Sequence, residues 1–230
     1  MKPHLLGWPI AFTVVLLGCG HRPEQYLAPD EVTDFAALYG SNCAACHGRD
    51  GRSGGARPLN DSLFLELIGK DRLREVIAKG VPHTAMPPFA DKEGGTLTDR
   101  QVAILADGMG SRWSHAGEPA GTVLPAYSAD LGDRKRGEIV FQEYCARCHG
   151  ARGAGGPNGS VVDPAFLALT SDQSLRTTVI AGRIDRAAPD WRGNIPGRVM
   201  TAEEIGDVVA WLSAHRVTAN IVAKGGTNQP

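Results

Sequence analysis

Aromatic residues are scarce in this 230-residue chain, at 6% of the sequence, and apolar runs are short. The run from Leu5 to Gly18 has 14 residues, fewer than the about 20 that a bilayer-spanning helix needs. The chain has no excess of charge of one sign, since it contains 25 acidic and 24 basic residues. This balance gives no indication of a nucleic-acid partner or of strong electrostatic steering of a partner. Strand-like alternation of apolar and polar residues is also missing. The sequence therefore indicates globular units with small apolar cores.

One motif occurs twice and runs each time into glycines. The pattern Cys-x-x-Cys-His is formed by Cys43, Cys46 and His47, and again by Cys145, Cys148 and His149. A zinc site needs four ligands at short spacing, whereas the two pairs lie 102 positions apart, and a redox dithiol would need a βαβ setting that is missing. A histidine directly after the second cysteine is what covalent haem attachment requires, because the thiols add to the porphyrin and the imidazole reaches the iron. The sequence predicts two haem c groups, whose porphyrins would enlarge the small cores.

The fifth cysteine, Cys19, ends the tetrapeptide Leu-Leu-Gly-Cys behind a short basic start and the apolar run. This arrangement is typical of a secretion signal, and the tetrapeptide resembles a bacterial lipobox, which implies cleavage before Cys19 and its lipidation. Several acyl chains would anchor the protein stably where one is marginal. The alternatives are an uncleaved anchor and an ordinary discarded signal. Because this type of haem attachment occurs outside the cytoplasmic membrane, we expect an exported, periplasmic, lipid-anchored protein.

The two halves of the chain repeat one unit. At an offset of 102 positions Gly80 matches Gly182 and Pro87 matches Pro189, and the stretch between the halves is rich in glycine, proline and alanine, as linkers are. The length suits two domains of about a hundred residues each. We expect a signal peptide at 1–18, a tether at 19–30, a first domain at 31–115, a linker at 116–132, a second domain at 133–217 and a tail at 218–230.

Each unit is predicted to be helical. Opening helices are expected over 30–40 and 133–144, and a further helix over 71–80. The terminal helices should begin at Thr98 and Thr201, where Thr-x-x-Gln and Thr-x-x-Glu fit the capping box. Helical spacing of apolar residues continues the first of these through Val102, Leu105, Ala106 and Met109. The predicted fold class is all-α.

These features together resemble class I c-type cytochromes, over about residues 30–113 and 133–216. The resemblance implies two tandem class I cytochrome c domains, each wrapped around one covalently attached haem. In that family a methionine before a proline binds the iron opposite the histidine, which carries over to Met86, 39 positions after His47. A thioether is soft and neutral and favours ferrous iron. His83 is the rival ligand, and filling of core space is the alternative role for Met86.

The second unit departs from this pattern. Ala188 stands 39 positions after His149, and alanine cannot bind iron. Met200, further along the same loop, is the substitute we expect, although it aligns with the apolar Leu97. An open or water-ligated iron and ligation by His215 are the alternatives.

Electron transfer is the function that two such haems predict. A lipid-anchored di-haem cytochrome c would carry single electrons between respiratory or dehydrogenase partners, as a free carrier or within a larger membrane complex. The alternative is a haem enzyme, peroxidase-like or acting on a small redox molecule, that uses an open sixth position on the second haem. Its acid–base groups would have to come from loop residues such as Arg183 and Asp185, and such charges are usually solvated. We expect an electron carrier rather than an enzyme, with redox proteins and a membrane, and no nucleic acid, as partners.

Overall fold

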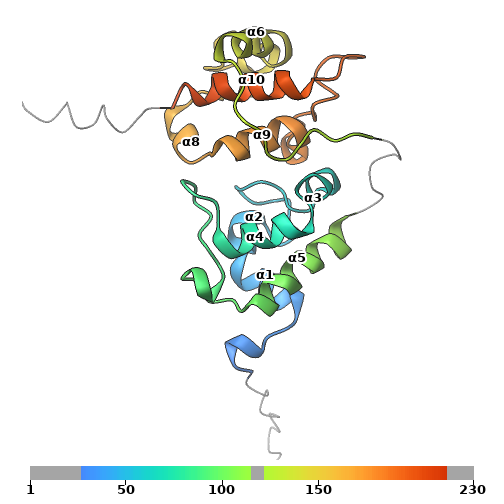
Figure 1. The fold of residues 1–230 in the computed structure, drawn as a ribbon, viewed down its shortest axis with the longest axis vertical. Coiled ribbons are helices and arrows are strands. Elements are labelled where there is room, and N and C mark those ends of the chain that lie inside the picture. Colours follow the sequence, from blue (N-terminus) through green and yellow to red (C-terminus); the bar gives the residue numbers. More distant parts are fainter. Residues whose placement is uncertain (1–26, 115–121, 217–230) are drawn as a thin grey trace, which may run out of the picture.

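The computed structural model describes residues 27–114 and 122–216, which form two helical units stacked along the long axis of the molecule (Figure 1). Within these ranges there is no strand, only isolated bridges at Ala90–Leu97, Arg183–Ala188 and Ile195–Arg198. The predicted all-α class is therefore confirmed.

The helices follow the same order in both units. The first unit contains η1 (Pro29–Glu31), α1 (Phe35–Asn42), α2 (Ala44–His47), α3 (Ser62–Ile68), α4 (Lys70–Lys79), η2 (Asp91–Glu93) and α5 (Asp99–Trp113). The second contains α6 (Arg134–Tyr144), α7 (Ala146–His149), α8 (Pro164–Ala168), α9 (Asp172–Ala181), η3 (Ile184–Arg186) and α10 (Ala202–Ser213). α1 and α6 correspond, as do α2 and α7, α4 and α9, and α5 and α10.

The opening helix of the first unit begins later than the sequence predicts. The prediction over 30–40 is wrong at its start, because the chain first forms the short η1 and α1 begins only at Phe35. The carboxylate of Asp34 accepts a hydrogen bond from the Ala37 amide at 2.8 Å, which makes Asp34 the N-cap. In the second unit Asp133 caps α6 in the same way.

The terminal helices begin where the sequence predicts, and both capping boxes are formed. Thr98 accepts a hydrogen bond from the Gln101 amide at 3.3 Å, while its own amide donates to the Gln101 side chain at 3.0 Å. Thr201 and Glu204 do the same at 3.1 and 2.8 Å. The apolar stripe of α5 is buried as expected, at Val102, Leu105, Ala106 and Met109.

Close helix approach builds each core around the terminal helix. In the first unit α5 packs on α1 at Gly108, where a Cβ would lie 2.2 Å from the Phe35 ring. In the second unit α10 packs on α6 at Gly137, where a Cβ would lie 2.0 Å from the carbonyl oxygen of Asp207. Only glycine permits these contacts. The glycine lies in the terminal helix α5 in the first unit, but in the opening helix α6 in the second.

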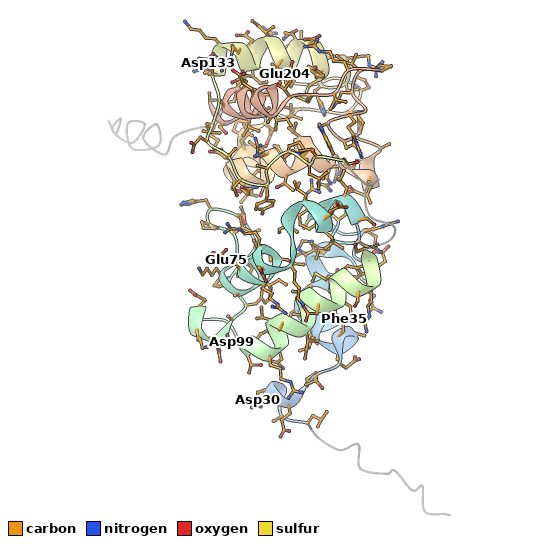
Figure 2. The ribbon with its side chains drawn as sticks, turned by 45° about the vertical axis from the view of Figure 1, so that its right-hand side comes forward. Asp30, Phe35, Glu75, Asp99, Asp133 and Glu204 are labelled. Carbon is orange, nitrogen blue, oxygen red and sulfur yellow. The ribbon has the colours of Figure 1, made fainter. Side chains whose placement is uncertain are left out.

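The two units meet through their middle helices. α3 of the first unit contacts α9 of the second, while α6 lies at the outer end of the second unit (Figure 1). Figure 2 shows Asp133 and Glu204 at this outer end, remote from Phe35 and Asp99 in the first unit. The loop that follows the first Cys-x-x-Cys-His turn lies at this contact, where Ala56 and Arg57 are hydrogen-bonded to the second unit.

Several sequence predictions fall outside the described residues. These are the signal peptide, Cys19 and most of the tether within 1–26, part of the linker at 115–121, and the tail at 217–230. Among the helices that the structure does describe, none combines the length and apolar character required to cross a bilayer.

Candidate haem sites

The first Cys-x-x-Cys-His motif forms one helical turn. Cys43 ends α1, with its amide donating to the Tyr39 carbonyl at 2.9 Å, and it also begins α2, with its carbonyl accepting from the His47 amide at 3.0 Å. Both thiols, on Cys43 and Cys46, are free. The turn therefore presents two thiols and one imidazole from a single rigid segment, which is the donor set that haem c requires.

His47 is held in the tautomer that suits an iron ligand. Its Nδ1 lies 2.8 Å from the carbonyl oxygen of Arg57, and because a carbonyl only accepts, Nδ1 carries the hydrogen. Nε2 is then free to bind iron as a neutral donor. Burial lowers the pKa of His47, which also favours the neutral ring, although the hydrogen bond to Arg57 acts in the opposite direction.

The second motif repeats this geometry. Cys145 ends α6 and its carbonyl accepts from the His149 amide at 3.0 Å, and Nδ1 of His149 lies 2.9 Å from the carbonyl oxygen of Gly159. Burial raises the pKa of the Cys145 thiol to about 12 and that of Cys43 to about 11, so the leading thiols of both motifs are protonated. Both sites therefore fit the same prosthetic group.

The acceptor carbonyls escaped the sequence analysis. Arg57 follows His47 by ten positions and Gly159 follows His149 by ten positions. The equal spacing in the two units is the signal that could have identified them. The glycines after each motif let this loop fold back, since a Cβ at Gly54 would lie 2.1 Å from the carbonyl oxygen of Cys46.

Met86 lies in the loop that connects α4 and α5. Its carbonyl accepts from the Val81 amide at 3.1 Å, and its amide donates to the Thr84 hydroxyl at 3.2 Å. A Cβ at Gly80 would lie 2.6 Å from the same Met86 carbonyl, so glycine is needed where the loop leaves α4. His83, the rival ligand, is exposed in this loop. Ligation by Met86 stays a prediction.

Ala188 occupies the corresponding place in the second unit. Its carbonyl accepts from the Arg183 amide at 3.0 Å, and a Cβ at Gly182 would lie 2.6 Å from that carbonyl oxygen. These contacts repeat those of Met86 with Val81 and Gly80. The two loops thus share a backbone arrangement and differ in the side chain that it presents.

Met200 occupies the place of Leu97. The Met200 amide donates to the Trp191 carbonyl at 3.1 Å, as the Leu97 amide donates to the Phe89 carbonyl at 2.8 Å. Met200 is 3% exposed and Leu97 is 4% exposed. Each precedes the N-cap of a terminal helix, the position from which an apolar side chain packs on the first turns. Packing therefore accounts for the burial of Met200, and its ligation stays a prediction.

The remaining histidine alternative lies at the end of α10. His215 is held by the Trp211 carbonyl, 2.9 Å from Nδ1, and its ring contacts the Trp211 ring at 4.4 Å between centroids.

The expectation that Arg183 and Asp185 are solvated charges is wrong. Their side chains are only 19% and 15% exposed, and they form an ion pair at 2.7 Å.

Two copies of this turn, each on a helical unit of the same design, define a tandem c-type cytochrome. The family described as cytochrome c oxidase, cbb3-type, subunit III matches residues 30–107 and 132–212, and the chain belongs to this family. It accordingly carries two haem c groups.

Individual relatives resemble parts of the chain. The cbb3-type cytochrome c oxidase subunit FixP of Sinorhizobium medicae is 30% identical over 171 residues, which cover 66% of this chain and 53% of that protein. The dihydro-heme d1 dehydrogenase of Pseudomonas aeruginosa is 38% identical over 104 residues, 44% of this chain and 21% of that protein. A solved reducing HAO-like protein complex of Kuenenia stuttgartiensis has a TM-score of 0.49 at 16% identity, covering 84% of this chain and 100% of that one. The chain spans about half the length of the FixP relatives that it matches.

Proposed function

We propose that this protein is a di-haem electron carrier that passes single electrons between redox partners, one of them a terminal oxidase or another respiratory complex. The observation that supports this most directly is the repeated turn, whose histidine is fixed in each copy by a backbone carbonyl at Nδ1. In the proposal Cys43 and Cys46 attach the first haem and His47 binds its iron; Cys145, Cys148 and His149 do the same for the second. Membership of the cbb3-type subunit III family supports an oxidase as the partner.

The hydrogen bond of His47 suits electron transfer that is not coupled to proton transfer. The haem, when bound, supplies the one-electron chemistry. The hydrogen on Nδ1 of His47 stays there, because a peptide carbonyl cannot take it up. The histidine is therefore a fixed donor in both oxidation states, as an electron carrier requires.

The proposal is tested by oxidation of the reduced protein. The ferrous protein is mixed under air with membranes that contain a cbb3-type oxidase, and its ferrous absorption is followed. We expect rapid loss of that absorption, and a haem content that falls from two to one when Cys145 and Cys148 are replaced by serine. Persistence of the ferrous form, with membranes that oxidise another cytochrome c, would overturn the proposal.

We further propose that the protein is exported and held at the periplasmic side of a bacterial membrane by lipid on Cys19. The support is the lipobox-like sequence alone. Cys19→Ala should release the protein into the soluble exported fraction, or block its processing, while both haems stay attached. Mass spectrometry of the mature amino terminus identifies the lipid, and an unmodified start at another residue would contradict the anchor.

A second candidate function is supported by Ala188. If Met200 only packs in the core and does not bind iron, the sixth coordination position of the second haem would be open to a small ligand, as a peroxidase-like enzyme would need. Against this candidate, Arg183 and Asp185 are bonded to each other at 2.7 and 2.8 Å and are not free to act as acid and base on a substrate. A peroxidase assay with the fully loaded protein tests this candidate, and turnover that Ala188→Met abolishes would support it.

A further inference from the structure

A single arginine of the first unit reaches into the second. The guanidinium of Arg57 donates through Nη2 to the carbonyl oxygen of Gly182 at 3.0 Å and to the hydroxyl of Thr178 at 3.3 Å. Thr178 lies in the last turn of α9 and Gly182 is its C-cap. Arg57 therefore closes the carboxyl end of a helix in the other unit, where the helix dipole also favours a cation.

The second unit returns the contact. Nη2 of Arg183, the residue after Gly182, donates to the carbonyl oxygen of Ala56 at 3.4 Å. The same guanidinium is held by Asp185, with Nε at 2.8 Å and Nη2 at 2.7 Å from its carboxylate oxygens. Two consecutive residues of each unit thus exchange arginine-to-carbonyl hydrogen bonds, and we call this arrangement the arginine clasp.

The clasp is mostly buried and electrically balanced. Arg57 is 16% exposed, and Asp61 beside it is 4% exposed at 3.8 Å, while Arg183 and Asp185 form the other pair. Burial lowers the pKa of Arg57 to about 10, against the opposing effect of Asp61. Desolvation of this kind offsets most of the gain from a buried ion pair, so the clasp contributes more to a defined arrangement of the units than to stability.

At each end of the arginine clasp, one residue also contacts a residue of a haem site. The backbone carbonyl of Arg57 accepts the Nδ1 hydrogen of His47, so the residue that crosses the contact also orients this imidazole. Gly182 opens the loop that presents Ala188, since a Cβ on it would meet the Ala188 carbonyl oxygen. One residue therefore connects the two sites, with its backbone carbonyl at His47 and its side chain at the start of the loop of the second site.

We propose that Arg57 and Arg183 lock the two haem units in one fixed orientation, and that Arg57 is a positioning residue that sets the hydrogen bond of His47. The second part rests on the proposed role of His47 as iron ligand. The first part does not depend on delivery of electrons to any partner. A fixed orientation would give the two sites a constant separation.

The test compares Arg57→Lys with Arg52→Lys. Lysine keeps the charge but lacks the guanidinium Nη2 that donates to both Gly182 and Thr178. Arg52 is the matched control, since it lies in the same loop and its Nε donates within the first unit, to Asn60 at 2.7 Å. Residual dipolar couplings of amides in α5 and α10 measure the relative orientation of the units in the haem-loaded protein.

We expect one shared alignment tensor for both units in the native protein and in Arg52→Lys, and loss of that shared tensor in Arg57→Lys. The potential of the first haem should rise in Arg57→Lys only, because a weaker hydrogen bond makes His47 a poorer donor to ferric iron. Arg183→Lys is the second variant, since it removes the return contact and leaves Arg57 in place; it should also loosen the orientation. A shared tensor and unchanged potentials in Arg57→Lys, or equal changes in Arg52→Lys, would overturn the proposal.

Failure of the clasp and failure of the proposed function are distinguishable. Orientation and potentials are measured on the isolated protein, whereas the proposed function is measured by oxidation with oxidase-containing membranes. A protein that loses its fixed orientation in Arg57→Lys but is never oxidised by those membranes would support the clasp and contradict the function.

Discussion

The loops that carry Met86 and Ala188 differ in one decisive side chain on the same backbone. Both carbonyls accept from the amide that follows a conformationally required glycine, Gly80 or Gly182. On the histidine side the two sites share the contact of Nδ1 with a carbonyl oxygen, but Arg57 also crosses to the other unit, whereas Gly159 has no side chain to do so. The comparison teaches that the duplicated fold supplies two attachment motifs of the same design, and that the sites differ in the side chains at Met86 and Ala188 and in the burial of their leading cysteines.

Exchange of the two side chains has the largest expected effect. Met86→Ala should lower the potential of the first haem by a sizeable part of the about 0.8 V over which axial ligands set haem potentials, because a ligand that favours ferrous iron is removed. Ala188→Met should leave the potential of the second haem nearly unchanged, because we expect Met200 to supply a methionine ligand to that iron already. Redox titration followed by the methionine-to-iron absorption at the red end measures both potentials.

Both variants should keep two haems, because attachment depends on the cysteines. Two outcomes would contradict this prediction. An unchanged potential in Met86→Ala would transfer the ligand role to His83 or another group, and a raised potential in Ala188→Met would show that Met200 does not bind the second iron.

The second prediction concerns Met200, which we retain as the proposed sixth ligand of the second haem. Met200→Leu is the sharpest variant, because leucine occupies the matching place, Leu97, in the first unit and preserves the packing. If Met200 binds iron, neither haem of the reduced native protein binds carbon monoxide rapidly, and the variant gains one rapid site. Flash photolysis measures the rate.

Rapid binding of carbon monoxide at one haem of the native protein, unchanged in Met200→Leu, would contradict ligation and favour the open sixth position. Slow binding in both proteins would instead implicate His215. Leu97→Met is the matched control and should leave the first haem unaltered.

Much of this comparison could be predicted from the sequence, but the contact between the units could not. The motifs, the capping boxes at Thr98 and Thr201 and the place of Ala188 follow from local patterns that one unit repeats. The clasp joins Arg57 to Thr178, 121 positions away, and uses backbone carbonyls that any residue provides. No local pattern marks such a contact, which is why Arg183 was described as a solvated charge.

The third prediction concerns Asp207, the buried acid of the terminal helix in the second unit. Asp207 in α10 is 2% exposed and accepts from the Asp133 amide at 2.6 Å and from Arg136 Nε at 2.7 Å. Burial acts to raise its pKa, but Arg136 and the Asp133 amide outweigh burial and hold the pKa of Asp207 below its ordinary value of 3.8. Such a carboxylate stabilises the fold above pH 3.8, and this contribution is lost as pH falls through the folded-state pKa.

We therefore expect acidification to destabilise the second unit through protonation of Asp207. Asp207→Asn should cost the second unit about 1–3 kcal/mol at neutral pH and remove this part of the acid sensitivity. Asp107→Asn is the control, since Asp107 lies in α5 with its side chain 45% exposed, and its surface pairs contribute about 0.5 kcal/mol. Amide signals of α5 and α10 during an acid titration distinguish the units, and an acid midpoint of α10 that Asp207→Asn leaves unchanged would contradict the prediction.

The smallest expected effect compares the two capping boxes. Thr98→Ala and Thr201→Ala each remove one side-chain acceptor from a helix N-terminus, at a cost of about 1 kcal/mol of unfolding free energy. Because the hydroxyl contacts are alike, at 3.3 and 3.1 Å, the two costs should agree within the error of denaturant titrations that follow each unit by its own amide signals. Serine at either position keeps the hydroxyl and should restore most of the loss. Equal costs would show that the helical scaffold is the same in the two units, and that differences between the haem sites have to be sought in Met86, Ala188 and Met200. Clearly unequal costs would mean that the two helical scaffolds have themselves diverged.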